Sequence, residues 1–571
     1  MSKAIARCLL IGAIIASLIN LPLFGGLTLS AYFLFSMVAA SAGVWLITQN
    51  AFFKVKQPTT VPVHFLLFLL LVTYVVIHGI VSANLNLVHY YWLVGLVFLF
   101  SIHYWINIDS GIAVYLLKGI AWAAILECIV VFLQYFGLVP SVDPLFRCTG
   151  TWVNPNVTAL FLAMAFYVVV KPHLFNKSVL PIAASAAIVG AILLLHCRTG
   201  LFMVFLFAAG RFGKEFIDIG HRRLRIGKTI LVTTAIILGV VCLCWLAFGM
   251  KQASTAGRWQ IWKNCLPLIA ERPIFGHGFG SFEKEYNLYV ATRGLPSNDH
   301  VNTPYNDFLE LAVEGGIVAV FLWGALLFTL IRNSIKNGRF FVPILAFTFL
   351  QLVNFGFEAI PVFSLLLAYM AIDTGDPGKT ALHSPLTRRL APVISILYYT
   401  LPLAALILGL SQLKLARAFY LKNEIATTYT ASDAIDAYGS LDEQLNGYQR
   451  YQEAYGDAFL YLGRYRPALA HYLAAAGVCS EPGILSKCAW CYALESRYDS
   501  SRYYYTLVEN MQPGMVGPRM ALLNLYRRQG DSSAMRVKAA EIVAMPIRIK
   551  NARADTMRLL AQRILEEKKT K

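Results

Sequence analysis

The chain has 571 residues, of which 57% are hydrophobic and 14% are charged, and its mean hydropathy is +0.58. A soluble protein carries about a quarter charged residues, so this composition excludes a fully soluble chain. The formal net charge of +18 is what an excess of Lys and Arg in cytoplasmic loops gives a membrane protein. We therefore expect a membrane protein with no nucleic-acid partner.

Apolar stretches that could cross a bilayer recur up to about residue 413, since about 20 apolar residues span roughly 30 Å of hydrocarbon. We expect the first stretch to be a span and not a cleaved signal peptide, because no small-residue cleavage site stands out after it. The pair 340–357 and 361–374 forms either two short spans or one long helix. We predict about 12–13 spans, at 4–24, 27–49, 61–83, 88–108, 112–136, 156–171, 178–196, 200–213, 228–249, 306–331, 340–357, 361–374 and 390–412.

Basic residues are distributed unequally between the predicted loops. With the N-terminus inside, the inner loops hold about eighteen Lys and Arg residues, as the positive-inside rule requires. This orientation places Arg147, Arg198 and the long loop 250–305 outside. If the short pair of spans is real, the C-terminal tail is outside as well. We predict a transmembrane domain at 1–413, followed by a water-soluble domain at 414–571.

The C-terminal tail shows an internal repeat. Gly463, Ser496 and Gln529 recur at a spacing of 33 residues within three helical-pair segments. A period near 34 with small or polar residues at the turn is typical of tetratricopeptide repeats. Such repeats stack into a concave surface that could hold a protein partner, and a purely structural cap is the alternative. Cys488 and Cys491 form a CxxC without a second pair, so we expect packed cysteines and no metal site.

Two polar clusters lie next to spans on the predicted outer side. The first, RCTGTWVNPN, runs from Arg147 to Asn156 and predicts a turn that starts a helix. The second, HCRTG, places Arg198 between two apolar runs, where a buried charge costs about 2.5–3.5 kcal/mol. The Arg198 guanidinium either extends to the interface or forms a fixed receptor for phosphate oxygens, which match its fork of donors.

Two further clusters belong to the long loop and the helix after it. Arg258 and Trp262 lie on an amphipathic segment suited to the outer interface. The GHGFG turn that follows lacks the spacing of a dinucleotide-binding or P-loop motif. Asn306, Glu310 and Glu314 are four residues apart and share one helix face. Three polar groups on one face of a helix that enters lipid must point toward a cavity or partner helices, and a helix start alone does not explain Glu314.

Taken in order, GTWVNPN, CRTG, RPIFGHGFGSF and YNDFLELAVEGGI resemble the O-antigen ligase and O-antigen polymerase superfamily of bacterial glycosyltransferases, which includes the protein O-oligosaccharyltransferases. The resemblance covers roughly residues 100–375. It implies an all-α, GT-C-like bundle in the bacterial inner membrane, with an active site on the periplasmic face and no metal or other cofactor. It also implies transfer of a glycan from undecaprenyl diphosphate to an acceptor hydroxyl.

The resemblance also implies roles for particular residues. Arg198 and Arg258 match the superfamily's two arginines by motif position, which implies that they stabilise the diphosphate leaving group. The superfamily commonly has a His directly before the Asn of its ND(Y/F)L helix, and here that residue is Tyr305. Either His300, five residues earlier, activates the acceptor as a base, or Tyr305 or an acidic residue positions the acceptor without a dedicated base. The substrate-binding residues that we expect are Arg147, Asn154, Asn156, Trp262, Tyr305, Asn306, Glu310 and Glu314.

Three activities fit this superfamily: ligation of a glycan to lipid A–core, glycosylation of protein Ser/Thr, and polymerisation of repeat units. An outward-facing repeat domain that binds an acceptor favours the first two, and lipid A–core ligation is the first hypothesis. From another class, a transporter would use His103, Lys118 and Glu127 as its route. A scaffold that acts through the repeat tail would leave Arg198 and Arg258 dispensable.

Overall fold

The computed structural model describes residues 2–20, 29–53, 61–82, 86–171, 179–218, 252–295, 300–337, 340–357, 359–373, 391–546 and 552–566, and every regular element in these ranges is a helix. The chain divides into two compact units. We call the first the membrane unit; it comprises Met1–Gln252 and Tyr305–Leu413. We call the second the repeat unit; it comprises Ala253–Pro304 and Lys414–Lys571. Much of the predicted long loop thus groups with the C-terminal residues.

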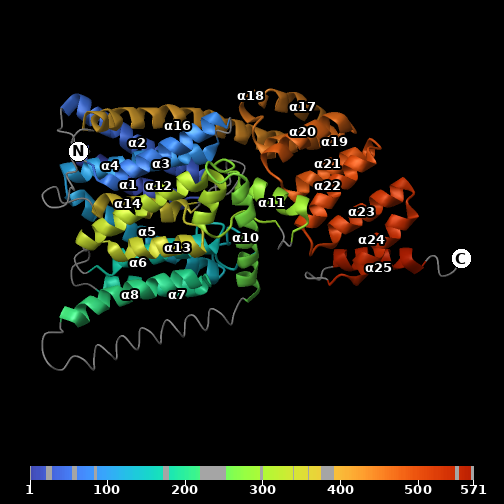
Figure 1. Cartoon of the computed structure of the whole chain (residues 1–571). Coiled ribbons are helices and arrows are strands. Elements are labelled where there is room, and N and C mark those ends of the chain that lie inside the picture. Colours follow the sequence, from blue (N-terminus) through green and yellow to red (C-terminus); the bar gives the residue numbers. More distant parts are fainter. Residues whose placement is uncertain are drawn as a thin grey trace. The chain divides into compact units, whose positions relative to one another are not determined.

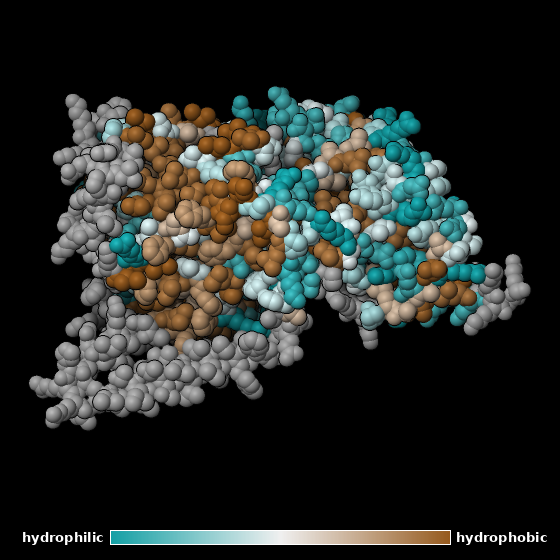
Figure 2. Space-filling view, in the orientation of Figure 1, coloured by the Kyte–Doolittle hydropathy of each residue, from teal (hydrophilic) through white to brown (hydrophobic). Residues whose placement is uncertain are grey.

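The membrane unit is a bundle of apolar helices, and hydrophobic residues cover most of its described surface in Figure 2. Its helices are α1 (Ser2–Leu18), α2 (Leu29–Phe53), α3 (Val63–Val81), α4 (Leu87–Ile108), α5 (Gly111–Tyr135), α6 (Pro155–Val169), α7 (Leu180–Leu194), α8 (Arg198–Asp218), α12 (Asp307–Asn337), α13 (Phe341–Val353), α14 (Ile360–Asp373) and the part of α16 (Ala391–Thr428) up to Leu413. Within the described ranges, six helices are long and apolar enough to cross a membrane, and five shorter apolar helices accompany them. The predicted polytopic helical bundle is confirmed, and the predicted span 228–249 lies outside the described residues.

A polar break separates α13 from α14. Asn354 is extended, with φ −157° and ψ −177°, and ends α13. Its side-chain oxygen accepts a hydrogen bond from the Phe355 N–H at 3.0 Å. The next amide, that of Gly356, donates to the Asp307 carboxylate at the start of α12. The backbone therefore leaves the helical path, and the segments form two helices instead of one.

The two ends of the bundle carry different groups. At one end Lys3 and Arg7 contact the Asp109 carboxylate, at 3.5 and 3.1 Å, where α4 is followed by α5. At the other end the Trp152 indole Nε1 donates to the Ser17 carbonyl at 3.1 Å, close to the last residue of α1. Because α1 and α5 both run from the first end to the second, the N-terminal basic residues lie opposite the turn that contains Trp152.

The C-terminal part of the repeat unit, from residue 431 on, is a stack of paired helices, which runs from orange to red in Figure 1. α19 packs against α20, α21 against α22, and α23 against α24. The helices are α10 (Gln252–Glu271), α11 (Phe282–Arg293), α17 (Ala431–Gly439), α18 (Asp442–Leu445), α19 (Gln449–Tyr461), α20 (Tyr465–Val478), α21 (Pro482–Leu494), α22 (Tyr498–Met511), α23 (Val516–Gln529), α24 (Ser532–Ala544) and α25 (Ala552–Glu566). The predicted helical repeat of the tetratricopeptide kind is thus present.

Each of the three helix pairs turns at a residue with a positive φ. These residues are Gly463 at 71°, Ser496 at 60° and Gly530 at 76°. The first two stand at the predicted spacing, but the third is Gly530 and not Gln529. The last interval is therefore 34 residues (530 − 496) instead of 33 (496 − 463). The sequence spacing located the repeat but misplaced its third turn by one residue.

Buried thiols and an ion pair connect the first two pairs of the stack. Cys488 and Cys491 are fully buried in an apolar core that also contains Tyr472. Both are free thiols packed among apolar side chains, as expected. At the edge of this core, Lys487 Nζ on α21 lies 2.7 Å from the Asp457 carboxylate on α19.

Candidate active site

Two polar side chains of α5 hold the turn that precedes α6. The Gln134 amide oxygen accepts from the N–H groups of Thr149 and Gly150, at 2.9 and 2.8 Å, and its nitrogen donates to the Gly150 carbonyl at 2.9 Å. The buried Glu127 carboxylate accepts from the Thr151 N–H at 2.7 Å and from its hydroxyl at 3.0 Å. Seven residues are about two helical turns, so both side chains project from one face of α5. The turn is therefore fixed to the bundle.

The predicted residues of this first cluster differ in what they do. The Asn154 side chain accepts from the Asn156 N–H at 2.9 Å and caps α6, with Pro155 at the first helical position. Arg147 is exposed; its guanidinium lies 4.1 Å from the centre of the Tyr135 ring, and its Nε donates to the Tyr135 carbonyl at 3.2 Å. Asn154 thus builds the helix start, while Arg147 lies on the surface beside it.

Arg198 is the first residue of α8 and lies near this turn. The Cys148 thiol donates to the Leu194 carbonyl at 3.4 Å, which joins the turn to the last residue of α7. α8 also packs closely on α6, because a Cβ added at Gly200 would lie 3.2 Å from the Ala159 carbonyl oxygen. The Arg198 side chain is half-buried.

Asn306 forms the start of α12 and ties it to α13. Its side-chain oxygen accepts from the N–H groups of Phe308 and Leu309, at 3.0 and 3.1 Å. Its side-chain nitrogen donates to the Leu352 carbonyl at 3.1 Å. The oxygen and the nitrogen of the Asn306 side chain therefore both make hydrogen bonds, the oxygen to the start of α12 and the nitrogen to the end of α13. The first turn of α12 and the last turn of α13 consequently lie together.

Asp307 strengthens the same junction. It is fully buried, and its two carboxylate oxygens accept from the Gly356 N–H at 3.0 and 2.9 Å. The Gln351 amide donates to it at 3.0 Å. A buried carboxylate is tolerated only where donors surround it, and here backbone and side chain both supply them. Asp307 was not among the predicted site residues.

The other predicted residues of α12 lie at or near its start. Tyr305 has a positive φ of 54°, and its ring centre lies 5.9 Å from that of Phe355. Glu310 is half-buried and Glu314 is buried, with 7% of its surface exposed. Gly316 then departs from helical geometry, with φ 63° and ψ −165°. Glu314 is thus inside the bundle, as its place on a shared polar face predicts.

The three clusters of the membrane unit meet at one end of the bundle. The Phe202 ring, about one turn beyond Arg198, lies 5.2 Å from the Phe349 ring, about one turn before the end of α13. The end of α13 is bonded to Asn306. The beginning of α8, the beginning of α12 and the turn before α6 therefore share the end that lies opposite the N-terminal basic residues.

The remaining predicted residues, Arg258, Trp262 and His300, lie in the repeat unit. Arg258 is half-buried on α10, about one turn before Trp262. The Trp262 indole N–H donates to the Pro304 carbonyl at 2.8 Å, which ties α10 to the segment that follows His300. The neighbouring Trp259 is 58% exposed. α10 thus combines one anchored and one exposed indole.

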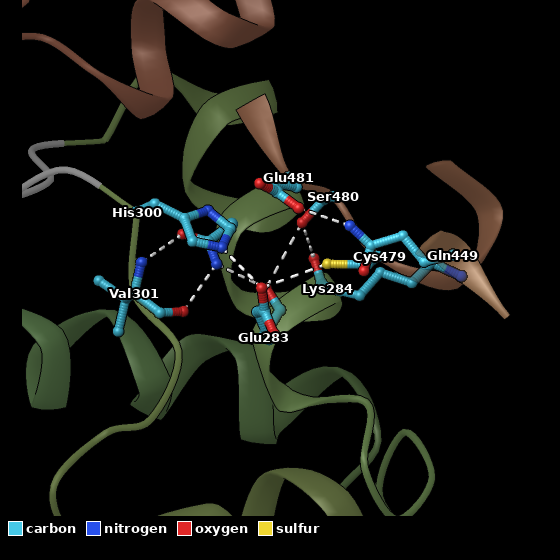
Figure 3. Close-up of polar contacts among 9 residues, drawn as sticks. Glu283, Lys284, His300, Val301, Gln449, Cys479, Ser480 and Glu481 are labelled. Atoms are coloured by element: carbon cyan, nitrogen blue, oxygen red, sulfur yellow. Dashed lines mark hydrogen bonds and ion pairs between the residues drawn. The ribbon is translucent and has the colours of Figure 1, made fainter. Parts of the chain in front are cut away.

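His300 is paired with a carboxylate from α11 (Figure 3). Its Nε2 lies 2.7 Å from Oε1 of Glu283, and its Nδ1 makes no hydrogen bond with any residue that the structure describes. Burial acts to raise the pKa of the Glu283 carboxyl, but hydrogen bonds from His300 and Cys479 outweigh it and hold that pKa below its ordinary value. An imidazole held at one nitrogen by a carboxylate can accept a proton at the other.

Glu283 and Gln134 were not predicted from the sequence, and Glu127 was not assigned to this end of the bundle. They belong to no recognisable motif, because each makes its hydrogen bonds to groups that lie many residues away in the sequence. The structure also accounts for two residues of the transporter hypothesis. Glu127 holds the turn before α6, and His103 Nδ1 pairs with the Tyr398 hydroxyl at 2.9 Å. Both are thus engaged in packing of the bundle.

Comparison with known proteins gives a family match for part of the chain. An uncharacterized protein of Haemophilus influenzae is 28% identical over 94 residues, which are 16% of this chain and 24% of the relative, so the chain matches about a quarter of that protein's length. The crystal structure of the APC/C hetero-tetramer Cut9–Hcn1 aligns over 93% of this chain and 90% of that chain at 11% identity, but its TM-score of 0.20 is too low to establish a common fold. Residues 155–324, a range that includes Arg198, Arg258, His300 and Glu314, match the family described as O-antigen ligase. The chain therefore carries an O-antigen ligase family domain at residues 155–324.

Proposed function

We propose that this protein is a membrane-embedded glycosyltransferase that moves a glycan from undecaprenyl diphosphate to an acceptor hydroxyl. The observation that carries the proposal is the meeting of three polar clusters at one end of an apolar bundle, in and beside the region that matches the O-antigen ligase family. The head group of a lipid-linked donor lies at a membrane surface. A rigid polar end of a membrane bundle is where such a head group can be bound.

Arg198 and Arg258 supply positive charge to the diphosphate in this proposal. Negative charge develops on the leaving phosphate oxygen as the glycosidic bond breaks, and preorganised donors stabilise it most in a site that excludes water. Guanidinium groups offer paired donors that match phosphate oxygens. Arg198 is also in the first turn of α8, where the helix dipole favours an anion. Transfer then needs no metal ion.

His300 is the proposed base. The acceptor hydroxyl gives its proton to the imidazole while its oxygen bonds to the anomeric carbon. The bond from that carbon to the phosphate oxygen breaks, and undecaprenyl diphosphate leaves with the bonding electron pair. Glu283, 2.7 Å from Nε2, orients the ring and stabilises the imidazolium that forms. The remaining proposed substrate contacts are Arg147, Asn154, Asn156, Trp262, Tyr305, Asn306, Glu310 and Glu314.

Lipid A–core is the proposed acceptor, and protein Ser/Thr and a growing glycan are the alternatives. The proposed location is the bacterial inner membrane, with the site and the repeat unit on the periplasmic side. The support for acceptor handling by the repeat unit is its size and its packing on α11, next to His300. A polymerase that joins lipid-linked glycans has less need of such a unit.

Transfer assays with purified protein test this function. The donor is a defined undecaprenyl-diphosphate glycan, offered with lipid A–core, with a Ser/Thr-rich protein or with a second donor molecule. Replacing Arg198 or Arg258 by Ala should lower kcat about 10²-fold or more. Arg466→Ala is the matched control, since this arginine is 90% exposed and lies 3.4 Å from Glu495 in the repeats; its rate should stay unchanged.

Two outcomes would contradict the proposal. Full transfer by both arginine variants would remove the electrostatic role assigned to them. A strong loss of transfer on adding a chelator would contradict metal independence, because the proposed chemistry places only guanidinium groups on the diphosphate. The acceptor that yields product decides among ligase, protein glycosyltransferase and polymerase.

A further inference from the structure

The segment that carries His300 is held by the C-terminal repeats. α11 belongs to the stretch between two membrane helices, and its hydrogen-bond partners in the repeats lie 196 to 219 residues further along the chain. It packs against α22, and the buried Ala291 on α11 lies in an apolar cluster with repeat residues. Those residues are Leu485, Leu507, Val508 and Met511.

Polar contacts fix the position of α11 along the repeats. The Ser480 hydroxyl donates to the carbonyls of Glu283 and Lys284, at 3.5 and 3.2 Å. At the other end of α11, the Asn510 amide donates to the Ala291 carbonyl at 2.8 Å. α11 is thus held at both ends, once by the turn between α20 and α21 and once by α22. We call these contacts the repeat clamp.

Glu283 connects the repeat clamp to His300. Its Oε1 accepts from the Cys479 thiol at 3.2 Å and lies 2.7 Å from His300 Nε2, so both groups share one oxygen (Figure 3). Asn287, one turn along α11, holds the residue after His300. It donates to the Val301 carbonyl at 2.8 Å and accepts from its N–H at 3.0 Å. α11 therefore fixes both the side chain and the adjoining backbone of His300.

Cys479 acts here as a hydrogen-bond donor and not as a nucleophile. Burial and the neighbouring Glu283 carboxylate raise the pKa of its thiol well above the ordinary value. Glu481, two residues after Cys479, is a further negative charge that acts on this thiol. The thiol therefore stays protonated and donates its hydrogen bond to the Glu283 carboxylate.

We propose that the repeat clamp positions the catalytic base of the membrane glycosyltransferase, with Glu283 as the positioning residue that transmits the contact to His300. The repeats would then be part of the transfer machinery and not only a surface that recruits an acceptor. This inference rests on the proposed function, because it assigns Glu283 a role through His300.

A double-mutant cycle on the full-length protein tests the link from Glu283 to His300. His300→Ala should lower kcat about 10²-fold. Glu283→Gln, which keeps the shape and loses the charge, should lower kcat about tenfold with KM unchanged, and Glu283→Asp should restore part of that loss. If Glu283 acts through His300, the double variant is no slower than His300→Ala alone. A double variant slowed by the product of the two single losses would overturn the inference.

A second experiment tests the repeat clamp without changing any residue near the imidazole. Ala291→Asp puts a carboxylate into the apolar cluster, and Thr292→Asp puts the same group on the exposed next residue of α11. Maleimide labelling of individual cysteines is followed by peptide mass spectrometry. Ala291→Asp should expose Cys479 and lower kcat about tenfold, while Cys488 stays protected and reports that the repeats remain folded. Thr292→Asp should leave Cys479 protected and kcat unchanged.

The outcomes separate the two proposals. Wild-type transfer by an Ala291→Asp protein with a labelled Cys479 would overturn the positioning role, and a Cys479 that stays protected would overturn the clamp. By contrast, no transfer by the wild type, or full transfer by His300→Ala, would refute the proposed chemistry. The labelling result would still decide whether the repeats hold α11.

Discussion

The Gly150→Ala substitution tests how firmly α5 holds the turn before α6. Gly150 has a φ of 73°, where a residue with a Cβ costs roughly 1–2 kcal/mol. The added Cβ would lie 2.1 Å from Glu127 Oε1 and 2.6 Å from Thr158 Cγ2. Forcing atoms into a packed site costs about 1–3 kcal/mol. Together the two effects destabilise the protein by about 2–5 kcal/mol.

Gly137→Ala separates backbone strain from overlap. Gly137 has nearly the same φ, 74°, but nothing lies within 4 Å of an added Cβ. The assay is the apparent Tm of both variants in one detergent, read with a thiol-reactive dye, together with the transfer rate. Gly150→Ala should lower Tm by clearly more than Gly137→Ala and should slow transfer, because the turn must move. Equal Tm values, or wild-type transfer by Gly150→Ala, would refute the conclusion that Glu127 and Gln134 fix the turn.

Three further predictions concern other parts of the chain. Ser496→Gly should raise the Tm of the repeat unit, since a non-glycine residue at φ 60° costs roughly 1–2 kcal/mol, of which about 0.5–1 is returned by the freer unfolded glycine; a lower Tm would contradict this. Asp307→Asn should destabilise the membrane unit by about 1–3 kcal/mol and slow transfer, because one oxygen that accepts from Gly356 becomes a donor; an unchanged Tm would count against it. The stabilising contribution of Glu283 should be full above its ordinary pKa of 4.5 and should be lost as pH falls below it, because its pKa is lowered in the folded protein. Hydrogen exchange in α11, corrected for intrinsic rates, should therefore rise toward low pH in the wild type and be less pH-dependent in Glu283→Gln.

The architecture was largely predictable because it depends on patterns that lie within short stretches of sequence. Apolar length located the helices of the membrane unit, and a spacing of 33 residues located the repeats. The period alone could not place the third turn, because only backbone geometry shows that Gly530, and not Gln529, adopts the positive φ. Whether α13 and α14 are separate was also undecided, since that depends on the contact between Gly356 and Asp307.

The candidate site was predictable only in part. The sequence singled out Arg198 and Asn306 as candidates, because they are polar residues beside apolar runs next to predicted spans. Glu127 and Gln134 were not found as supports of the turn, because their partners are 15 to 24 residues away and are mostly backbone amides. Glu283 was missed because its partners come from two distant segments. Contacts of this kind leave no periodic trace in a single sequence.

The most direct test of the central proposal is the transfer rate of Arg198→Ala, measured with a defined undecaprenyl-diphosphate glycan and the acceptor that the wild type uses. We expect a loss in kcat of about 10²-fold or more, with partial recovery in Arg198→Lys, which keeps the charge but not the fork of donors. A wild-type rate in Arg198→Ala, or no transfer by the wild-type protein to any of the three acceptors, would contradict the proposal.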